Sequence, residues 1–375
     1  MSFTSVLYSF RGYVMKRTET RPVYIKGIQL GGQDKCLIQS MTNTLTKDIQ
    51  ATIKQINSLA TLGCDLVRIA VLDEEDAHAI KEIVQNVSVP LVADIHFNYR
   101  LALIAIENGI HKIRLNPGNI GNPEHIKLIV DACKEKGIPI RIGINSGSLE
   151  KNILAKYTEP CAEAMIESAK YHIDLLEKFC FYDIVLSFKS SDVLLTIDAY
   201  QKAAQIFPYP LHLGVTEAGT LLKSAIKSSA ALGTLLSQGI GDTIRISVSD
   251  APEEELIVAK QLLRAFNLYR KTVNLISCPT CGRLQYDMLP IVKEIEVYLD
   301  TLSLDISVAV MGCPVNGPME AARADIGIAG GYHEALLFRK GQFIRTVPQK
   351  DIVQELIVEI EKIKNSIERI SSKRT

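Results

Sequence analysis

Three cysteines in two short turns are the residues of this 375-residue chain most suited to chemistry. Cys278 and Cys281 lie in SCPTCGR, and Cys313 lies in MGCPVNGPME. Three thiolates can hold a soft metal centre but leave its coordination shell one ligand short. Such a shell is typically completed by a residue elsewhere in the protein or left open for chemistry. Glu320, in the same turn as Cys313, is the nearest candidate for a fourth, exchangeable ligand. The set predicts a redox or Lewis-acid metal site.

The spacing of the cysteines leaves three kinds of site open. A single CxxC pair occurs in zinc sites, in redox dithiols and in iron–sulfur proteins. Zinc sites usually add a second CxxC pair or two histidines, and this stretch of sequence has neither. The third cysteine follows an apolar run and a glycine, 32 residues after Cys281. This context favours an iron–sulfur cluster over zinc or a dithiol.

The composition limits the class of protein that can carry these groups. The chain has 42 basic and 42 acidic residues, so general binding to nucleic acid or to an anionic membrane is not expected. The first residues, MSFTSVLYSFRGYVMKR, lack the apolar core of a secretion signal, and no apolar run reaches the ~18 residues of a membrane span. We therefore expect a cytoplasmic protein, with the other five cysteines buried and reduced.

Eight short apolar runs alternate with helical stretches between residues 36 and 250. The helical stretches include residues 51–63, 76–85, 124–137 and 163–179, and glycines such as Gly63, Gly109 and Gly137 stand where helix C-caps are expected. Eight such alternations predict a (β/α)8 barrel of the TIM type rather than an open sheet, and no GxGxxG turn follows any of the runs. The runs are CLIQSM (36–41), DLVRIAV (65–71), PLVADIH (90–96), KIRLNPG (112–118), PIRIGINSG (139–147), YDIVLSFK (182–189), LHLGVTEAG (211–219) and DTIRISVS (242–249).

Polar side chains gather near the ends of these predicted strands, and the C-terminal ends of barrel strands meet at one mouth. The cationic members would repel one another without an anionic partner, and arginine forks match phosphate oxygens. The sequence therefore predicts a substrate that bears phosphate or diphosphate, although a structural ion pair is the alternative for any single residue. The candidates are Arg68, Asp94, His96, Arg114, Asn116, Arg141, Asn145, Lys189, His212, Thr216, Glu217, Arg245 and Ser247.

The last hundred residues predict a small α/β module. Residues 273–278 and 306–313 are predicted strands that run into the two cysteine turns, and residues 287–302 are a predicted helix between them. Two shorter strand segments and a closing amphipathic helix follow. Because both turns follow strands at corresponding points, we expect the module to bring them together. The predicted domains are residues 1–270, a substrate-binding barrel, and residues 271–375, a metal-binding module.

Several long motifs together resemble the 4-hydroxy-3-methylbut-2-enyl diphosphate synthase family, an iron–sulfur enzyme family of the methylerythritol phosphate route to isoprenoids. The resemblance runs from about residue 20 to the last helix. The matching stretches are QSMTNT (39–44), VPLVADIHF (89–97), RLNPGNIG (114–121), IPIRIGINSGSLE (138–150), HLGVTEAG (212–219), GIGDTIRISVS (239–249), SCPTCGR and GCPVNGPME.

The resemblance implies a reaction, a cofactor and partners. The substrate would be 2-C-methyl-D-erythritol 2,4-cyclodiphosphate, opened by two-electron reduction with loss of water to (E)-4-hydroxy-3-methylbut-2-enyl diphosphate. Flavodoxin or ferredoxin would supply the electrons. The cofactor would be a [4Fe–4S] cluster held by Cys278, Cys281, Cys313 and Glu320. The enzyme would be a homodimer in which one subunit's cluster domain covers the other subunit's barrel mouth.

The same resemblance assigns roles within the mouth. Glu217 would be the proton donor or a charge-stabilising acid, and the four arginines with Lys189 would hold the diphosphate. Asn116, Asn145, Thr216 and Ser247 would position the rest. One departure is Met319, where the family motif NGPGE has glycine; a positive φ there would strain the methionine. The rivals are a barrel hydrolase or lyase with a structural zinc domain, and an iron–sulfur sensor without catalytic activity.

Overall fold

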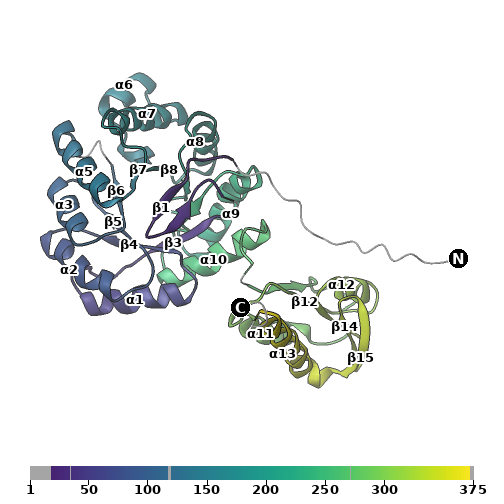
Figure 1. The fold of residues 1–375 in the computed structure, drawn as a ribbon. Helices are drawn as coiled ribbons and strands as arrows, with labels where there is room; N and C mark the ends of the chain where they lie inside the picture. The colour runs from purple at the N-terminus through teal and green to yellow at the C-terminus, as the bar shows by residue number, and fades with distance from the viewer. Residues whose placement is uncertain (1–17, 34, 117–119, 271, 372–375) are drawn as a thin grey trace. The chain divides into compact units, whose positions relative to one another are not determined.

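The computed structural model describes residues 18–33, 35–116, 120–270 and 272–371 (Figure 1). The chain divides into two compact units between Leu268 and Tyr269. The N-terminal stretch 1–17 and residues 117–119 of the RLNPGNIG motif lie outside the described residues. Among the helices that are described, none is both long and apolar enough to span a membrane.

Eight parallel strands form the central sheet of the first unit, in the order β8-β7-β6-β5-β4-β3-β10-β9. A parallel bridge between Leu186 and Leu211 joins the two edges, so the sheet closes into the predicted barrel. Each of the eight apolar runs contains one strand. The strands are β3 (Leu37–Met41), β4 (Leu66–Ala70), β5 (Leu91–Asp94), β6 (Lys112–Leu115), β7 (Ile140–Asn145), β8 (Ile184–Lys189), β9 (His212–Leu213) and β10 (Thr243–Ile244).

Amphipathic helices surround these strands (Figure 1). The sequence sets their ends locally: Asn122 accepts a hydrogen bond from the Glu124 amide at the start of α5, and Gly137 ends that helix at a φ of +65°. The helices are α1 (Ile49–Thr61), α2 (Glu74–Gln85), α3 (Tyr99–Glu107), α5 (Pro123–Lys136), α6 (Lys151–Tyr157), α7 (Ala162–Lys178), α8 (Val193–Ile206), α9 (Leu221–Ser237) and α10 (Pro252–Ala265), with a short 3₁₀ turn at Ser146–Ser148.

A hairpin that sequence reasoning did not identify precedes the barrel. Its strands are β1 (Val23–Ile25) and β2 (Ile28–Leu30), joined by Lys26 and Gly27, both at positive φ as a two-residue hairpin turn requires. Its apolar side chains form one cluster with Leu37, Leu66 and Val185, which lie at the N-terminal ends of their strands. The hairpin therefore provides an apolar floor at the end of the barrel opposite the mouth.

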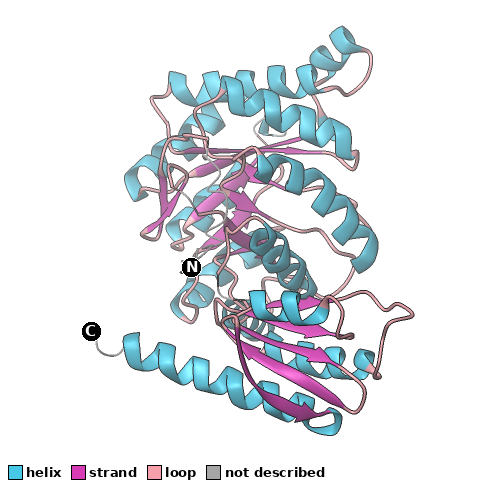
Figure 2. Ribbon diagram, turned by 90° about the vertical axis from the view of Figure 1, so that its right-hand side faces the viewer, coloured by secondary structure: helices cyan, strands magenta, loops and turns pink. Residues whose placement is uncertain are grey.

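The second unit is a five-stranded sheet in the order β11-β12-β13-β14-β15 (Figure 2). The first three strands are parallel and the last two are antiparallel additions. Alternate residues of β12 face two layers: Val308 and Val310 join the main core with α11 and α13, and Ala309 and Met311 pack with α12. The elements are β11 (Asn274–Ser277), α11 (Met288–Asp300), β12 (Ser307–Met311), α12 (Gly317–Arg323), β13 (Ile326–Gly330), β14 (Glu334–Arg339), β15 (Gln342–Pro348), a 3₁₀ turn at Gln349–Asp351 and α13 (Ile352–Ser371).

The five cysteines outside the two turns are free thiols, as expected, but they are not all buried. Cys36, Cys64 and Cys133 are buried, whereas Cys161 is half-buried and Cys180 is exposed. The expectation of burial was therefore wrong for Cys180. It follows the C-terminal end of α7 at a φ of +55°, in the turn that leads to β8.

Candidate active site and metal centre

The interior of the barrel is polar and strongly cationic above its apolar floor. Two carboxylates, Asp94 and Glu255, are buried among the cationic side chains. Because cations outnumber carboxylates in a region shielded from water, an anionic ligand would be bound there strongly. The cationic side chains are Arg68 (β4), Lys112 and Arg114 (β6), Arg141 (β7), Lys189 (β8) and Arg245, which follows β10.

Asp94, the last residue of β5, is the centre of one polar cluster. Its Oδ1 lies 2.9 Å from Arg114 Nη1, and its Oδ2 lies 3.7 Å from Arg68 Nε and 3.5 Å from His96 Nε2. Burial alone would raise the pKa of Asp94, but Arg68, His96 and Arg114 together lower it below its usual range. Asp94 is therefore an ionised residue that fixes two arginines of adjacent strands at the mouth.

Arg141 and His212 lie deeper and are almost completely buried. Arg141 Nε and Nη1 make no hydrogen bond with any group that the structure describes. Burial, followed by the neighbouring Arg68 and Arg114, lowers the pKa of Arg141. His212 Nδ1 lies 2.7 Å from Thr243 Oγ1, and burial, Arg141 and Lys189 lower the pKa of the imidazole. Arg141 thus has donors to offer a ligand, and His212 is a neutral imidazole.

Arg245 has a partner already. Its Nε and Nη2 donate to the two carboxylate oxygens of Glu255 on α10, at 3.1 and 2.8 Å, and Ser40 Oγ donates to the same carboxylate at 2.8 Å. The structural ion pair considered as the alternative for each arginine is therefore present here. Of the guanidinium nitrogens of Arg245, only Nη1 does not bond the carboxylate, and it lies 3.8 Å from Met41 Sδ.

Two glycines that sequence reasoning did not single out make room for the cationic side chains. A Cβ on Gly143 would lie 2.9 Å from Arg114 Nε, and one on Gly214 would lie 3.3 Å from Lys189 Nζ. Both stand within the predicted strand runs, 139–147 and 211–219. Gly143 lies on β7, next to β6 with Arg114, and Gly214 directly follows β9, next to β8 with Lys189.

Glu217 lies in the loop between β9 and α9, exposed to solvent, at a φ of +54°. That backbone conformation is costly for a residue with a Cβ and occurs often at functional sites. Its carboxylate forms no ion pair with the described residues, so the salt bridge that was its alternative role is not present. The preceding Thr216 anchors the loop, because its amide donates to the Ser190 carbonyl at 3.1 Å.

The remaining predicted residues lie at the same strand ends. Asn116, directly after β6, is buried, and Asn145 ends β7 in register with Lys189. Ser247, after β10, accepts a hydrogen bond at its carbonyl from Ser224 Oγ at 2.6 Å. The predicted residues therefore come from seven different strands, and most of them lie at one end of the sheet, whereas Arg141 and His212 stand near the beginnings of β7 and β9.

The two cysteine turns of the second unit follow the neighbouring parallel strands β11 and β12. The Gly312 amide donates to Cys278 Sγ at 3.3 Å, so the two turns are in direct contact. Backbone N–H groups of Asn316 and Val315 lower the pKa of Cys313, and Gly317 and Arg283 add to the effect. These are the conditions that favour a thiolate, the form in which cysteine binds metal.

The four candidate ligands are not gathered into one shell. Within the described residues, no group of three or more His, Cys, Asp or Glu side chains lies close enough to hold a metal ion. Cys281 and Glu320 are both exposed, and Glu320 Oε1 is paired with Arg323 Nη1 at 3.1 Å. The donor chemistry, with thiols on two touching turns and an N–H directed at sulfur, fits a soft iron–sulfur centre.

Comparison with known families decides the classification. A family model described as the GcpE TIM-barrel domain matches residues 20–260, and one described as the GcpE protein C-terminal domain matches residues 274–362. This chain belongs to the GcpE family. The two matched ranges together contain all the strands from β1 to β15, so both units carry the family's pattern.

Relatives of the GcpE chain are closely similar over nearly their whole length. One from Bacillus licheniformis is 55% identical over 350 residues, covering 93% of this chain and 95% of the relative. Another from Bacillus mycoides is 55% identical over 348 residues with the same coverage. Both are named 4-hydroxy-3-methylbut-2-en-1-yl diphosphate synthase (flavodoxin). The family resemblance drawn from the motifs is thus confirmed. Among solved structures, dihydropteroate synthase from Yersinia pestis covers 64% of this chain and 98% of its own at 14% identity, with a TM-score of 0.42.

Met319, the departure from the GcpE motif, lies inside α12. It is not among the described residues with a positive φ, so the condition under which strain was expected here is not met. The side chain is exposed and leaves the first turn of α12 intact, with the Glu320 amide donating to the Asn316 carbonyl at 3.2 Å. A methionine is therefore accommodated here because a helical backbone tolerates any side chain that points into solvent.

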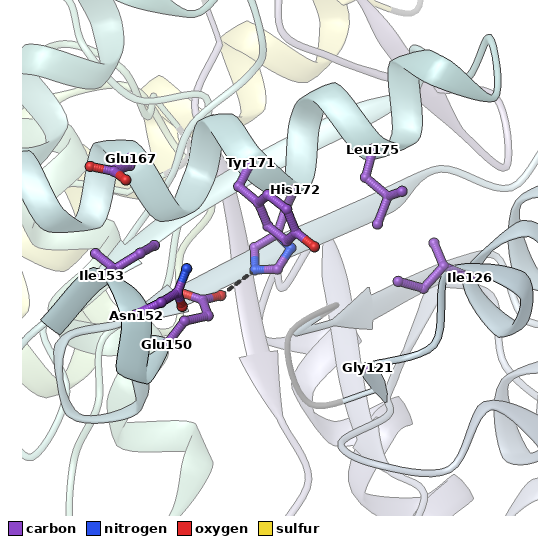
Figure 3. Close-up of a pocket in the computed structure, with 9 residues that line it drawn as sticks. All are labelled: Gly121, Ile126, Glu150, Asn152, Ile153, Glu167, Tyr171, His172 and Leu175. Atoms are coloured by element: carbon purple, nitrogen blue, oxygen red, sulfur yellow. Dashed lines mark hydrogen bonds and ion pairs between the residues drawn. The ribbon is translucent and has the colours of Figure 1, made fainter. Parts of the chain in front are cut away.

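A separate cavity of about 240 Å³ lies among α5, α6 and α7 of the GcpE barrel (Figure 3). His172 and Glu150 form its polar wall, and His172 Nε2 lies 2.6 Å from Glu150 Oε1. None of its lining residues belongs to the cationic set, and none was predicted as functional. The pair joins α7 to the residue before α6, which fixes the segment that follows Asn145.

Proposed function

We propose that this GcpE-family chain converts 2-C-methyl-D-erythritol 2,4-cyclodiphosphate into (E)-4-hydroxy-3-methylbut-2-enyl diphosphate. The reaction consumes two electrons and two protons and releases water. The single observation that best supports it is the excess of buried cations over carboxylates inside the barrel, which suits a compact substrate with two phosphoryl groups. The names of the two Bacillus relatives agree with this reaction.

In this proposal the cationic residues bind the diphosphate, and their contributions to binding differ. Arg141 offers two nitrogens that have no partner among the described groups. Arg141 and Lys189 are both close enough to His212 to lower its pKa. Arg68 and Arg114 are oriented by Asp94, so their forks are already directed when the substrate arrives. Such preorganisation lowers the entropic cost of binding. Asn116, Asn145, Thr216 and Ser247 would then orient the organic part of the substrate, with His96 at the rim.

Glu217 would act on the hydroxyl that leaves as water. A hydroxide is a poor leaving group, and protonation of its oxygen by a carboxylic acid lowers the barrier to C–O cleavage. The exposed loop position and the strained φ of Glu217 suit a group that must face a substrate rather than support the fold. Because it forms no ion pair with the described residues, its carboxyl group is available to a bound substrate.

For the cofactor, we propose that Cys278, Cys281, Cys313 and Glu320 hold a [4Fe–4S] cluster. The cluster, when bound, supplies single electrons and an iron with an exchangeable ligand. For Glu320 to be that ligand, its ion pair with Arg323 must open, which is an inexpensive change because both side chains are exposed. The proposed electron donor is flavodoxin or ferredoxin, and the proposed assembly is a homodimer.

The decisive experiment combines anaerobic purification with turnover. We expect a brown protein with about four irons per chain that converts the cyclodiphosphate when reduced by dithionite, and by reduced flavodoxin. A colourless protein that binds zinc and rejects iron after anaerobic reconstitution would overturn the reductive reaction. It would favour the rival barrel hydrolase with a structural zinc domain. A brown protein that fails to bind the cyclodiphosphate would instead favour the sensor.

A further inference from the structure

A second polar tier lies between the cationic mouth and the apolar floor of the barrel. Its members are Gln39 on β3, Lys112 on β6 and His212 on β9, each no more than 1% exposed. Within the part of the chain that the structure describes, both amide atoms of Gln39, Lys112 Nζ and His212 Nε2 lack a hydrogen-bond partner. Four unsatisfied polar atoms in one buried region are unusual in a folded protein.

Strand geometry fixes the depth of this tier. Side chains two residues apart on a strand share a face, so Lys112 lies one step below Arg114 and Gln39 one step above Leu37 of the floor. The register agrees, since Lys112 pairs with Val92 whereas Arg114 pairs with Asp94 at the strand end. The tier therefore lies between the apolar floor formed by the hairpin and the cationic side chains of the mouth.

The burial of Lys112 near other cations destabilises the folded protein when no ligand is bound. Burial, then Arg141 and Arg68, lowers the pKa of Lys112 well below its ordinary value. A barrel interior at this depth is usually filled by branched apolar side chains. An amine that lacks a described partner and faces two arginines therefore opposes folding, which suggests that the residue serves ligand binding rather than stability.

We propose that Lys112 is a positioning residue for the reaction proposed above: from the tier that it shares with His212, it supports Arg141 and becomes a cation when the anionic substrate binds. The inference rests on the proposed function. Burial, then Arg141 and Arg68, lowers the pKa of Lys112, and an anion held by Arg141 and Lys189 opposes this effect and raises the pKa again. The added positive charge then strengthens the grip on the bound phosphates without a direct contact.

Proton uptake on binding is the distinctive consequence. The charged and titratable groups that face the tier come from seven strands and two helices, and the anion changes the field at all of them. His212 and Lys189 also have pKa values below their ordinary range, so they add to the uptake. The facing groups are Arg68, Asp94, Arg114, Arg141, Lys189, His212, Arg245, Glu255 and Tyr200.

The test is calorimetry on the cluster-loaded enzyme without reductant, with the cyclodiphosphate titrated in two buffers of different ionisation enthalpy. We expect Lys112→Met to take up fewer protons than the wild type, by up to one, and to bind about tenfold more weakly. Its ligand-free Tm should rise by about 2–4 °C, because an unpartnered buried amine is removed. The matched control is Lys54→Met on the exposed face of α1, which should leave all three quantities unchanged.

A second variant, Lys112→Gln, guards against a packing artefact because it keeps a polar group at the position. Equal proton uptake and affinity in wild type and both variants would overturn the inference while the proposed function stands. A lower Tm in both variants with unchanged affinity would assign Lys112 a structural role and also overturn it. If the wild type itself fails to bind the cyclodiphosphate, the proposed function fails and the inference falls with it.

Discussion

Arg245 and Glu255 are joined by a two-fold hydrogen bond, with Nε to Oε2 at 3.1 Å and Nη2 to Oε1 at 2.8 Å. The carboxylate comes from α10, ten residues later in the chain, and is itself almost completely buried. This pairing neutralises one of the four mouth arginines in the free protein. Arg141, by contrast, has two nitrogens without a partner among the described residues. The arginines of the mouth are therefore not equivalent.

Replacement of Arg141 by Ala should weaken substrate binding far more than replacement of Arg245. Two charge-assisted hydrogen bonds are worth about 3–6 kcal/mol, so Arg141→Ala should raise KM by at least about 100-fold. Arg245→Ala loses less direct binding and chiefly leaves Glu255 unpaired, so its main effect should be a lower Tm. Steady-state kinetics with the cyclodiphosphate, alongside thermal melts, separates the two. A larger KM for Arg245→Ala than for Arg141→Ala would contradict this ranking.

The strands and their order could be predicted from the sequence because each apolar run is long enough for one strand and each is separated by a helical pattern. The mouth residues followed from those strands, since parallel strands end at the same edge. The partner of Arg245 could not be predicted, because Glu255 reaches it from a helix and no periodicity relates the two. Lys112 carried a usable signal that was overlooked: it lies two residues before Arg114 and so shares its face.

The metal centre was harder to predict for a different reason. Strand order alone brings the turns after β11 and β12 together, and the contact between Gly312 and Cys278 agrees with that. The positions of Cys281 and Glu320 depend on local backbone torsions and on the pairing of Glu320 with Arg323. Neither the backbone torsions nor this ion pair can be predicted from the pattern of apolar residues. The φ of Met319 likewise depends on where α12 begins, which the motif NGPME does not determine.

Asp94→Asn should destabilise the barrel by about 3 kcal/mol at neutral pH, because it leaves two buried arginines without their shared anion. The pKa of Asp94 is lower in the folded state than in the unfolded chain, so its contribution is complete above the unfolded pKa of about 3.9. The stability difference between wild type and variant should therefore stay constant from pH 8 to about pH 5. It should shrink only below about pH 4. Urea titrations across that range measure it, and a difference that already shrinks near pH 6 would contradict the assigned ion pairs.

Glu217→Gln should lower kcat by at least about 100-fold while leaving iron content unchanged, because the amide cannot donate the proton. Glu217→Gly should be equally inactive but more stable by about 1 kcal/mol, since glycine adopts the positive φ without strain. Glu159→Gln, on an exposed residue before α7, is the control and should retain full activity. Turnover rates with a chemical reductant measure kcat, and thermal melts measure the change in stability. Wild-type turnover by the Gln variant would remove Glu217 from the mechanism.

Gly312→Ala should lower iron loading several-fold without unfolding the second unit. A Cβ at this position would overlap Leu284 Cδ1, reach Met288 Sδ at 3.3 Å and lie 3.5 Å from Cys278 Sγ, so we expect the Leu284 side chain to move and the packing beside Cys278 to change. Gly282→Ala, in the neighbouring CxxC turn, is a matched control because a Cβ there meets no atom within 4 Å. Iron counts after parallel anaerobic reconstitution compare the two. Equal loading would show that contact between the turns is not required for the cluster.

Removal of iron by a chelator should leave the second unit folded. Its core contains buried side chains from β12, β13, α11 and α13, among them Val308, Ile326, Ile295 and Leu356, whereas Cys278 of the CxxC turn is only partly buried against it. This differs from small zinc domains, in which metal binding supplies the folding free energy. Far-ultraviolet circular dichroism should therefore be the same before and after chelation, with loss of activity and colour only. A large loss of helix or sheet signal would mean that the cluster, rather than the apolar core, stabilises this unit.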